Sequence, residues 1–477
     1  MRYRPKPTTI PAHATAGAIA HQPLTQVPVF LRPASKPAFR LPQATGVQTV
    51  GFLILAAFLF FYFSRVLDFV LAYLHLPLVL ACIAAVFALA SGRLPQTMTS
   101  RIGICLMFLT AWLALSGVAS IWKGGSLVVF KEEWLRAVLI FPLAGSLIAN
   151  STQALRAIRT CAYATLVAGI LALTIGRVVE GRLGLPGGSY DNPNDLARAI
   201  LLGMSWWWFM AHNPRHSFFL RVLSCVGLMI LTVVLVKTAS RAAFITLILM
   251  LPPLFLYYRP LGRMRMVVAL SLALMGSLIL VPGTIRYRLT TLFEGDAATS
   301  AEEAYISSEA LGSSQSRMYL LRRSIQFTAQ HPIFGVGIGM FPVADDAVAS
   351  LSGAHGNWHG THNTFTEISS EAGIPALIAL VAVFVISWRD LRRLLKDPRL
   401  PLHPNAKQIE TGIMALKLMF LSAAVGGMFA HFSYSAVIPS MAALVYAFGR
   451  SVREELTQFD AAPAGRAQPD AGRLPVG

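Results

Sequence analysis

Long apolar segments recur along most of this chain, and they restrict its possible folds more than any other feature. An α-helix needs about 20 mainly apolar residues to cross a bilayer, because its backbone polar groups must be satisfied internally within hydrocarbon. Hydrophobic residues make up 55% of the 477 residues and charged residues only 13%, with a mean hydropathy of +0.59. These values lie outside the range of soluble globular proteins. The sequence therefore predicts an all-α polytopic membrane protein.

About twelve transmembrane helices are predicted, and one long polar segment separates the ninth from the tenth. We expect a disordered basic cytoplasmic arm at 1–45, helices one to nine within 46–282, and a periplasmic catalytic loop with short amphipathic helices at 283–372. Helices ten to twelve follow within 373–450, and a disordered cytoplasmic tail occupies 451–477. The predicted spans are residues 47–64, 69–90, 102–121, 135–148, 157–175, 196–211, 218–236, 242–258, 266–281, 374–388, 412–432 and 436–448.

Lys and Arg residues are concentrated in the short loops on one predicted side of the membrane, and such loops stay in the cytoplasm. With both termini inside, the cytoplasmic loops contain Arg93, Arg101, Arg156, Arg159, Arg215, Arg221, Arg259, Arg263, Arg265, Arg389, Arg392, Arg393, Lys396, Arg399 and Lys407. The polar segment 283–373 then lies on the outer face. The net charge of +18 is spread over loops, whereas nucleic-acid binding needs a basic folded face. We therefore expect a lipid bilayer, and no nucleic acid, as a partner.

Several basic residues fall on the outer side, against this bias: Arg177, Arg182, Arg198, Lys237, Arg241, Arg286, Arg288, Arg317, Arg322 and Arg323. A guanidinium group matches phosphate oxygens as a planar fork and stays charged when partly desolvated. An anionic, lipid-linked substrate is the simplest partner for such groups. An outer arginine can instead reach lipid headgroups or pair with a nearby carboxylate. Arg241, however, lies so close to the hydrocarbon that it needs an anionic partner.

An amphipathic helix is predicted to start at Arg317 and to lie along the membrane surface. An arginine near a helix start adds to the positive end of the helix dipole, where phosphate groups are favoured. The run GVGIG that follows is interpreted as a flexible turn. The start of the expected helix is capped by Ser313, Ser314 or Ser316, and the helix ends at His331-Pro332. An apolar stripe along it is formed by Met318, Leu321, Ile325 and Phe327.

Three histidines follow in the run HGNWHGTH, at positions 355, 359 and 362. On one helix face they could gather a metal ion, but the two glycines between them oppose a continuous helix, and we predict no metal. An imidazole can accept a proton near neutral pH. His362 is the candidate catalytic base, because it lies just before Asn363 and a predicted span, beside Arg241. Glu367 and Glu371 would orient it if this segment is helical.

Seven further outer-face residues are candidates for substrate binding: Asn194, Arg198, Arg288, Trp358, His359, Asn363 and Glu371. In the run DNPND, Asn194 could bind sugar hydroxyls or donor phosphate, but an asparagine there is equally explained as a helix cap. Trp358 could stack on a sugar ring.

Three blocks of the chain resemble the bacterial O-antigen ligase and polysaccharide polymerase superfamily of polytopic membrane glycosyltransferases. They are GSYDNPNDLA, TASRAAF, and the pair Ser316-Arg317 followed by HPIFGVGIGMF and THNTFTEISSEAGIPAL. The resemblance covers about residues 187–380, and it departs from the family pattern at Ala376, where a glycine is common.

The resemblance implies an enzyme of the bacterial inner membrane that transfers a glycan from undecaprenyl pyrophosphate to an acceptor hydroxyl on the periplasmic face. Arg241 and Arg317 are then expected to engage the donor pyrophosphate, and His362 to assist the acceptor. The acceptor is the lipid A core or a growing polysaccharide. A single displacement would invert the anomeric carbon, and neither a metal nor a cofactor is required.

Two alternatives remain open at this point. A transporter or flippase of a lipid-linked or anionic substrate would also have about twelve spans, but should show charges near the middle of the bilayer or broken helices in paired halves. Within the superfamily, the sequence does not separate a ligase from a polymerase or from a protein glycosyltransferase.

Overall fold

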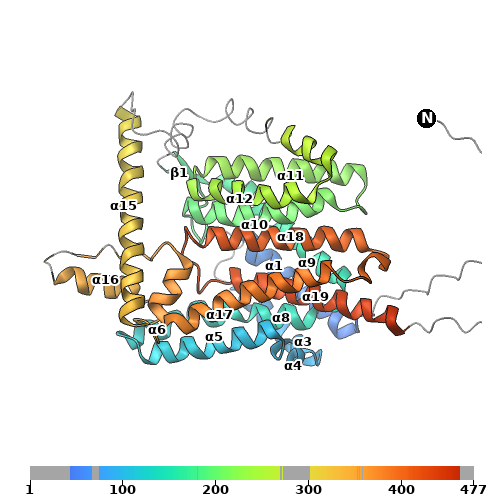
Figure 1. Ribbon diagram of the computed structural model, residues 1–477, viewed down its shortest axis with the longest axis horizontal. Coiled ribbons are helices and arrows are strands. Elements are labelled where there is room, and N and C mark those ends of the chain that lie inside the picture. The colour runs from blue at the N-terminus through green and yellow to red at the C-terminus, as the bar shows by residue number, and fades with distance from the viewer. Residues whose placement is uncertain are drawn as a thin grey trace, which may run out of the picture. The chain divides into compact units, whose positions relative to one another are not determined.

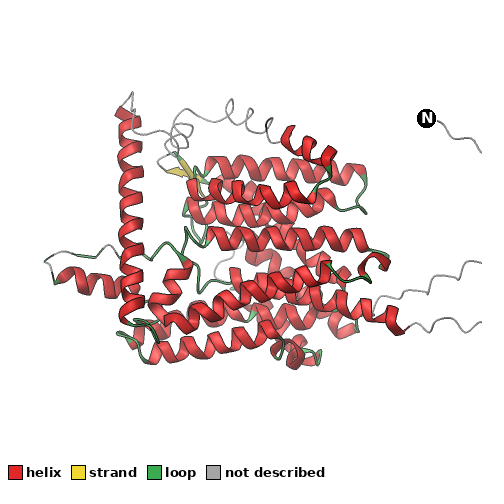
Figure 2. Ribbon diagram, viewed as in Figure 1, coloured by secondary structure: helices red, strands yellow, loops and turns green. Residues whose placement is uncertain are grey.

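The computed structural model describes residues 43–66, 75–179, 181–268, 271, 301–351, 353, 355–356 and 358–461, and these residues are almost entirely helical (Figures 1 and 2). The exception is a short antiparallel hairpin of β1 (Arg177–Val179) and β2 (Arg182–Gly184). In order, the helices are α1 (Gly46–Ser64), α3 (Leu76–Ala90), α4 (Leu94–Met98), α5 (Arg101–Val118), α6 (Lys123–Val129), the π-helical η2 (Phe130–Leu135), α7 (Arg136–Val138), α8 (Ile140–Leu147), α9 (Ser151–Ile175), α10 (Pro193–His212), α11 (Phe218–Lys237), α12 (Arg241–Tyr257), α15 (Ala301–Gln330), α16 (Phe341–Ser350), α17 (Thr364–Leu395), the 3-10 helix η3 (Leu400–Leu402), α18 (Ala406–Gly426) and α19 (Val437–Ala461).

Six helices in this described part are long and apolar enough to cross a membrane: α1, α5, α9, α11, α17 and α18. The shorter apolar helices α3 and α12 occupy the second and eighth predicted spans. Helices α10 and α19 lie at the sixth and twelfth, and both carry charged residues. An all-α membrane protein agrees with these findings. The count of twelve stays a prediction, since most of the ninth span lies outside the described residues, as do 1–42 and 462–477.

Several predicted spans have different boundaries in the structure; the twelfth, for example, continues as α19 to Ala461 instead of ending at residue 448. The fourth is not one helix, because a π-helical turn at 130–135 and the short α7 precede α8. The tenth begins ten residues earlier than predicted, at Thr364, and it bends at Gly373, which has φ +82°. The eleventh ends at Gly426 instead of residue 432. Near the tenth and eleventh, the hydroxyl of Thr364 donates to the carbonyl oxygen of Ala430 (2.7 Å), a contact between distant segments that a hydropathy pattern does not reveal.

Three of the short loops meet at one end of the helices. The backbone N–H of Ser151 donates to Glu455 (2.8 Å), whose other carboxylate oxygen lies 3.1 Å from His403. Arg93 lies 3.6 Å from the neighbouring Glu454. The loops before α5, α9 and α18 therefore converge on the second half of α19.

Helix α15 runs across the ends of α5 and of the main part of α17, beyond the bend at Gly373 (Figure 1). It begins at Ala301, so Arg317 lies in its second half, and the predicted start at Arg317 was wrong. Its end at Gln330, before His331-Pro332, is as predicted. Leu320, Phe327 and the 336–344 segment form a small separate core. The predicted apolar stripe is correct only in part, because Met318 and Ile325 are half exposed.

Candidate active site

A cavity of about 310 Å³ lies where α12, α15, the start of α17 and the segment after α18 meet. Two guanidinium groups line it, those of Arg241 at the first position of α12 and Arg317 in α15. The imidazole of His362, just before α17, lines it as well. The remaining lining residues are Ala242, Ile245, Met318, Leu321, Thr361, Asn363, Met428 and Phe429. The structure thus brings together the three residues to which the sequence assigned the chemistry.

The segment between α18 and α19 is fastened to the first turn of α17. The hydroxyl of Thr364 donates to the carbonyl oxygen of Ala430 (2.7 Å). The backbone N–H of Ser433 donates to Glu367 (3.0 Å), and the Ser433 hydroxyl donates to the carbonyl oxygen of Thr364 (2.8 Å). These three side chains are buried, so the hydrogen bonds are shielded from water. They hold the segment against the loop that carries His362.

A second imidazole, that of His431, faces His362 across this junction. The two ring centroids are 5.0 Å apart, and the His359 ring lies 6.4 Å from His362. His431 was not among the predicted site residues, because it was placed inside the eleventh span. A histidine at the outer boundary of a span was the signal that could have found it. Among the described residues, no three His, Cys, Asp or Glu side chains are arranged to hold a metal ion.

The surroundings of His362 favour its neutral form. Burial, together with the nearby His431, Arg317 and His359, lowers the pKa of His362 to about 4. The imidazole is therefore uncharged at pH 7 and has a free nitrogen lone pair. Its backbone adopts φ +52°, a left-handed conformation that is uncommon outside glycine and is found at functional sites.

Arg317 and Arg241 present two positive charges to one cavity. Burial lowers the pKa of Arg317, and the charge of Arg241 adds to this effect. Within the described ranges, no hydrogen bond or ion pair joins Arg317 to another residue. Two guanidinium groups close enough to repel each other have the charge and geometry that suit an anion with more than one charge.

Asn194 is held by two neighbours. Its side-chain oxygen accepts hydrogen bonds from Arg182 (2.7 Å) and Ser240 (2.9 Å), which connects the β-hairpin to the start of α12. The cap of α10 is Asn192, not Asn194. Asn194 therefore supports the residue next to Arg241, and its binding to substrate stays a prediction.

Arg198 lies beside Asn194, in a small hollow next to the main cavity; the two share Ala242 and Phe429. It is 3.1 Å from Asp195, and its guanidinium lies 4.6 Å from the ring centre of Phe432. Among the described residues, one of its buried guanidinium nitrogens has no hydrogen-bond partner.

Glu371 binds the protein's own backbone and does not line the cavity. Its carboxylate accepts hydrogen bonds from Gly339 N–H (2.8 Å), Phe341 N–H (3.0 Å) and the hydroxyl of Tyr434 (2.7 Å). Glu367, the other expected partner of His362, binds Ser433 instead. The structure therefore gives both carboxylates a positioning role, in place of direct contact with the imidazole.

The run GVGIG is a tightly packed turn, not the flexible one that was predicted. Gly337 has φ +110°, and a Cβ there would overlap the side chain of Ser120. Gly335 has φ +65°, and a Cβ there would overlap the backbone of Glu371. These glycines are required because α17 and the end of α5 approach the turn so closely.

The other predicted substrate-binding residues lie around the cavity or outside the described part. Asn363 caps α17, since its side-chain oxygen accepts from Phe365 N–H (3.0 Å) and Thr366 N–H (3.2 Å). Trp358 is 60% exposed, and His359 is exposed beside it. Arg288 lies outside the described residues.

Residues 226–381 match the family model described as O-Antigen ligase. This match includes Arg241, Arg317 and His362, and it supports the O-antigen ligase and polysaccharide polymerase superfamily for the chain. No curated protein matches the chain.

Proposed function

We propose that this protein, whose residues 226–381 belong to the O-antigen ligase superfamily, transfers a glycan from undecaprenyl pyrophosphate to an acceptor hydroxyl. The observation that carries the proposal is that Arg241, Arg317 and His362 line one cavity. A diphosphate is the anion that suits two adjacent guanidinium groups. The acceptor is a sugar of the lipid A core or of a growing surface polysaccharide.

The two arginines act on the leaving group. As the bond between the anomeric carbon and the phosphate oxygen breaks, its electron pair goes to the pyrophosphate, which gains negative charge. Fixed cations aimed at that oxygen contribute about 3 to 4 kcal/mol in a poorly hydrated site. The apolar lining of Ile245, Leu321 and Phe429 lowers the hydration of the cavity and gives the lipid chain a surface to contact.

His362 acts on the acceptor. Its neutral imidazole takes the proton as the hydroxyl oxygen attacks the anomeric carbon from the side opposite to the leaving group, so the configuration inverts. General-base assistance of this kind contributes about 10² to 10⁴ in rate. The negative charge of a bound pyrophosphate opposes the repulsion from Arg317, which makes His362 more basic when the donor is present.

We place this reaction on the periplasmic face. Support comes from the loops that contain Arg93 and His403, which gather around Glu454 and Glu455 of α19 at the opposite end of the helices and carry Lys and Arg residues. Such loops stay in the cytoplasm. Cysteine labelling of Ser435→Cys from outside intact cells, with Thr99→Cys as the inside control, tests this orientation.

The test of function uses Arg241→Gln, Arg317→Gln and His362→Gln in a strain that lacks the native gene. We expect each variant to lose surface glycan and to accumulate the lipid-linked donor. The controls are Arg322→Gln, an exposed arginine on α15, and His331→Gln, an exposed histidine at its end.

A flippase gives a different result. If the protein moves the lipid-linked glycan across the membrane, the donor accumulates on the cytoplasmic side, where periplasmic hydrolases cannot reach it. An unchanged level of surface glycan in the variants Arg241→Gln and Arg317→Gln would contradict both the transferase role and the flippase role. Transfer by the purified protein to a defined acceptor separates ligation from polymerisation.

A further inference from the structure

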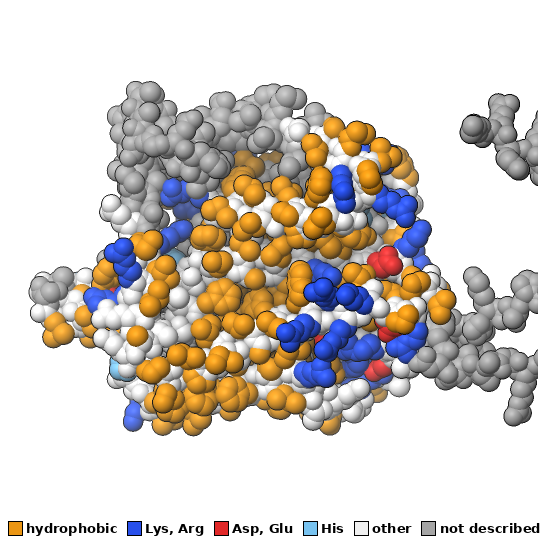
Figure 3. Space-filling view, in the orientation of Figure 1, with side chains coloured by type: hydrophobic (Ala, Val, Ile, Leu, Met, Phe, Trp, Pro, Cys, Tyr) orange, Lys and Arg blue, Asp and Glu red, His pale blue; other side chains and the backbone are white. Residues whose placement is uncertain are grey.

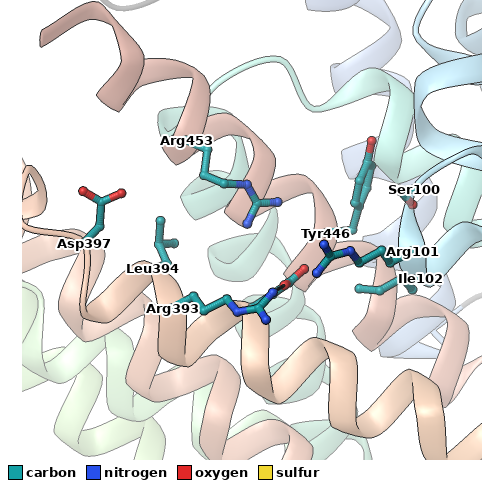
Figure 4. A pocket seen from close by; sticks show the side chains of 9 residues that line it. Ser100, Arg101, Ile102, Arg393, Leu394, Asp397, Tyr446 and Arg453 are labelled. Atoms are coloured by element: carbon teal, nitrogen blue, oxygen red, sulfur yellow. Dashed lines mark ion pairs between the residues drawn. The ribbon is translucent and has the colours of Figure 1, made fainter. Parts of the chain in front are cut away.

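A second cavity, of about 380 Å³, lies at the other end of α5 and α17 from His362. Three arginines line it, Arg101 from the start of α5, Arg393 from the last turns of α17, and Arg453 from α19. Their guanidinium groups point toward one another, in a region where basic side chains gather on the surface (Figures 3 and 4). The remaining lining residues are Ser100, Ile102, Asp390, Leu394, Asp397 and Tyr446.

The carboxylates at this cavity do not balance the three guanidinium groups. Asp397 is already paired with Arg399 through contacts of 2.9 and 2.8 Å, and it points away from the arginines (Figure 4). Asp390 lies 4.0 Å from Arg393, at the limit of an ion pair. In the part of the chain that the structure describes, no hydrogen bond or ion pair engages Arg101 or Arg453. Three positive charges therefore face one uncompensated carboxylate.

We propose that this cavity binds a phosphate group, carried either by the headgroup of an anionic phospholipid or by a soluble phosphate. Guanidinium forks from three helices can surround a tetrahedral phosphate on several sides. Both α5 and α17 are long enough to cross a membrane, so their ends lie at the depth of lipid headgroups. Ile102, Leu394 and the ring of Tyr446 provide apolar surface beside the charges. The site is independent of the proposed glycan transfer, because it shares no residue with the cavity at His362.

The test compares two double variants with equal changes in charge. Arg101→Gln/Arg453→Gln removes two cavity arginines, and Arg389→Gln/Arg392→Gln removes two exposed arginines of α17 that do not line the cavity. Native mass spectrometry of the purified full-length protein measures binding of phosphatidylglycerol and of phosphatidylcholine. Melting temperatures with and without sodium phosphate measure binding of the soluble anion.

If the ligand is a lipid headgroup, the unmodified protein binds phosphatidylglycerol more tightly than phosphatidylcholine. In the cavity variant, the affinity for phosphatidylglycerol falls by about tenfold or more, the equivalent of one charge-assisted hydrogen bond. For a soluble phosphate, sodium phosphate raises the melting temperature of the unmodified protein and of the control, but not of the cavity variant. Equal responses of the cavity and control variants to both probes overturn the proposal. If the cavity double variant does not fold, the single variants Arg393→Gln and Arg392→Gln, at adjacent positions, give the same comparison.

Discussion

Replacing Arg317 with glutamine should make the protein more stable and less active at the same time. Burial and the nearby charge of Arg241 both disfavour the charged form of Arg317, and no described residue compensates it. Two like charges in a partly buried site repel by on the order of 1 kcal/mol after solvent screening. Arg317→Gln removes this repulsion and leaves no described partner unsatisfied. In the proposed transfer, it also removes a cation that acts on the leaving group, so kcat/KM should fall by about 10² to 10³.

The two effects are measured on the same purified protein. Thermal unfolding in detergent reports stability, and transfer from a lipid-linked oligosaccharide reports kcat/KM. Arg322→Gln is the matched control, because it removes an exposed arginine from the same helix and should change neither quantity. Arg317→Lys keeps the charge without the planar fork and should retain part of the activity. Loss of stability together with activity in Arg317→Gln would show that the arginine holds the fold, and the reasoning would be refuted.

Three further predictions concern the surroundings of this cavity. Because the pKa of His362 is about 4, its neutral form persists as pH falls, so kcat/KM should stay level down to about pH 5 and drop only near pH 4. A fall in kcat/KM already near pH 6.5 would contradict the burial argument. His431→Ala should move the fall in kcat/KM to higher pH, because His431 lowers the pKa of His362. Gly337→Ala should destabilise the protein by about 2 kcal/mol or more, measured by thermal unfolding, since the new methyl group meets Ser120 and the backbone has φ +110°. Asn363→Ala should cost about 1 kcal/mol through the lost cap of α17, while Asn363→Ser should keep the stability; a loss of activity in Asn363→Ser alone would indicate a contact with substrate.

Much of the helical framework could be predicted from the sequence, because apolar segments of span length carry a strong signal. Pro332 correctly marked the end of α15. The start of α15 was predicted too late, since the polar residues before Arg317 carry no apolar stripe. The bend at Gly373 depends on a contact with a distant turn, where the carbonyl oxygen of Pro332 accepts from Ile374 N–H (2.8 Å), and no local pattern contains this contact.

Arg241, Arg317 and His362, the three main residues of the predicted site, line one cavity, whereas the contacts that support them were not predicted. Arg241 and Arg317 stood out because charged residues at an apolar boundary need a partner. His431 did not stand out in the sequence, because its place opposite His362 depends on hydrogen bonds between Thr364 and the segment after α18. The binding of Glu371 to Gly339 and Tyr434 is equally non-local. An acidic residue close in sequence to the candidate histidine is therefore no guide to what orients that histidine.

The packing of Gly335 and Gly337 has a consequence for how distant homologues should be recognised. These glycines stand out in the sequence, yet steric necessity at the crossing of two helices explains them, and no reacting atom is involved. A search profile weighted toward this turn detects shared architecture. A homologue could keep the whole scaffold and lack the equivalents of Arg241 or His362. Only the identity of those cavity residues would then distinguish an active enzyme from a pseudoenzyme.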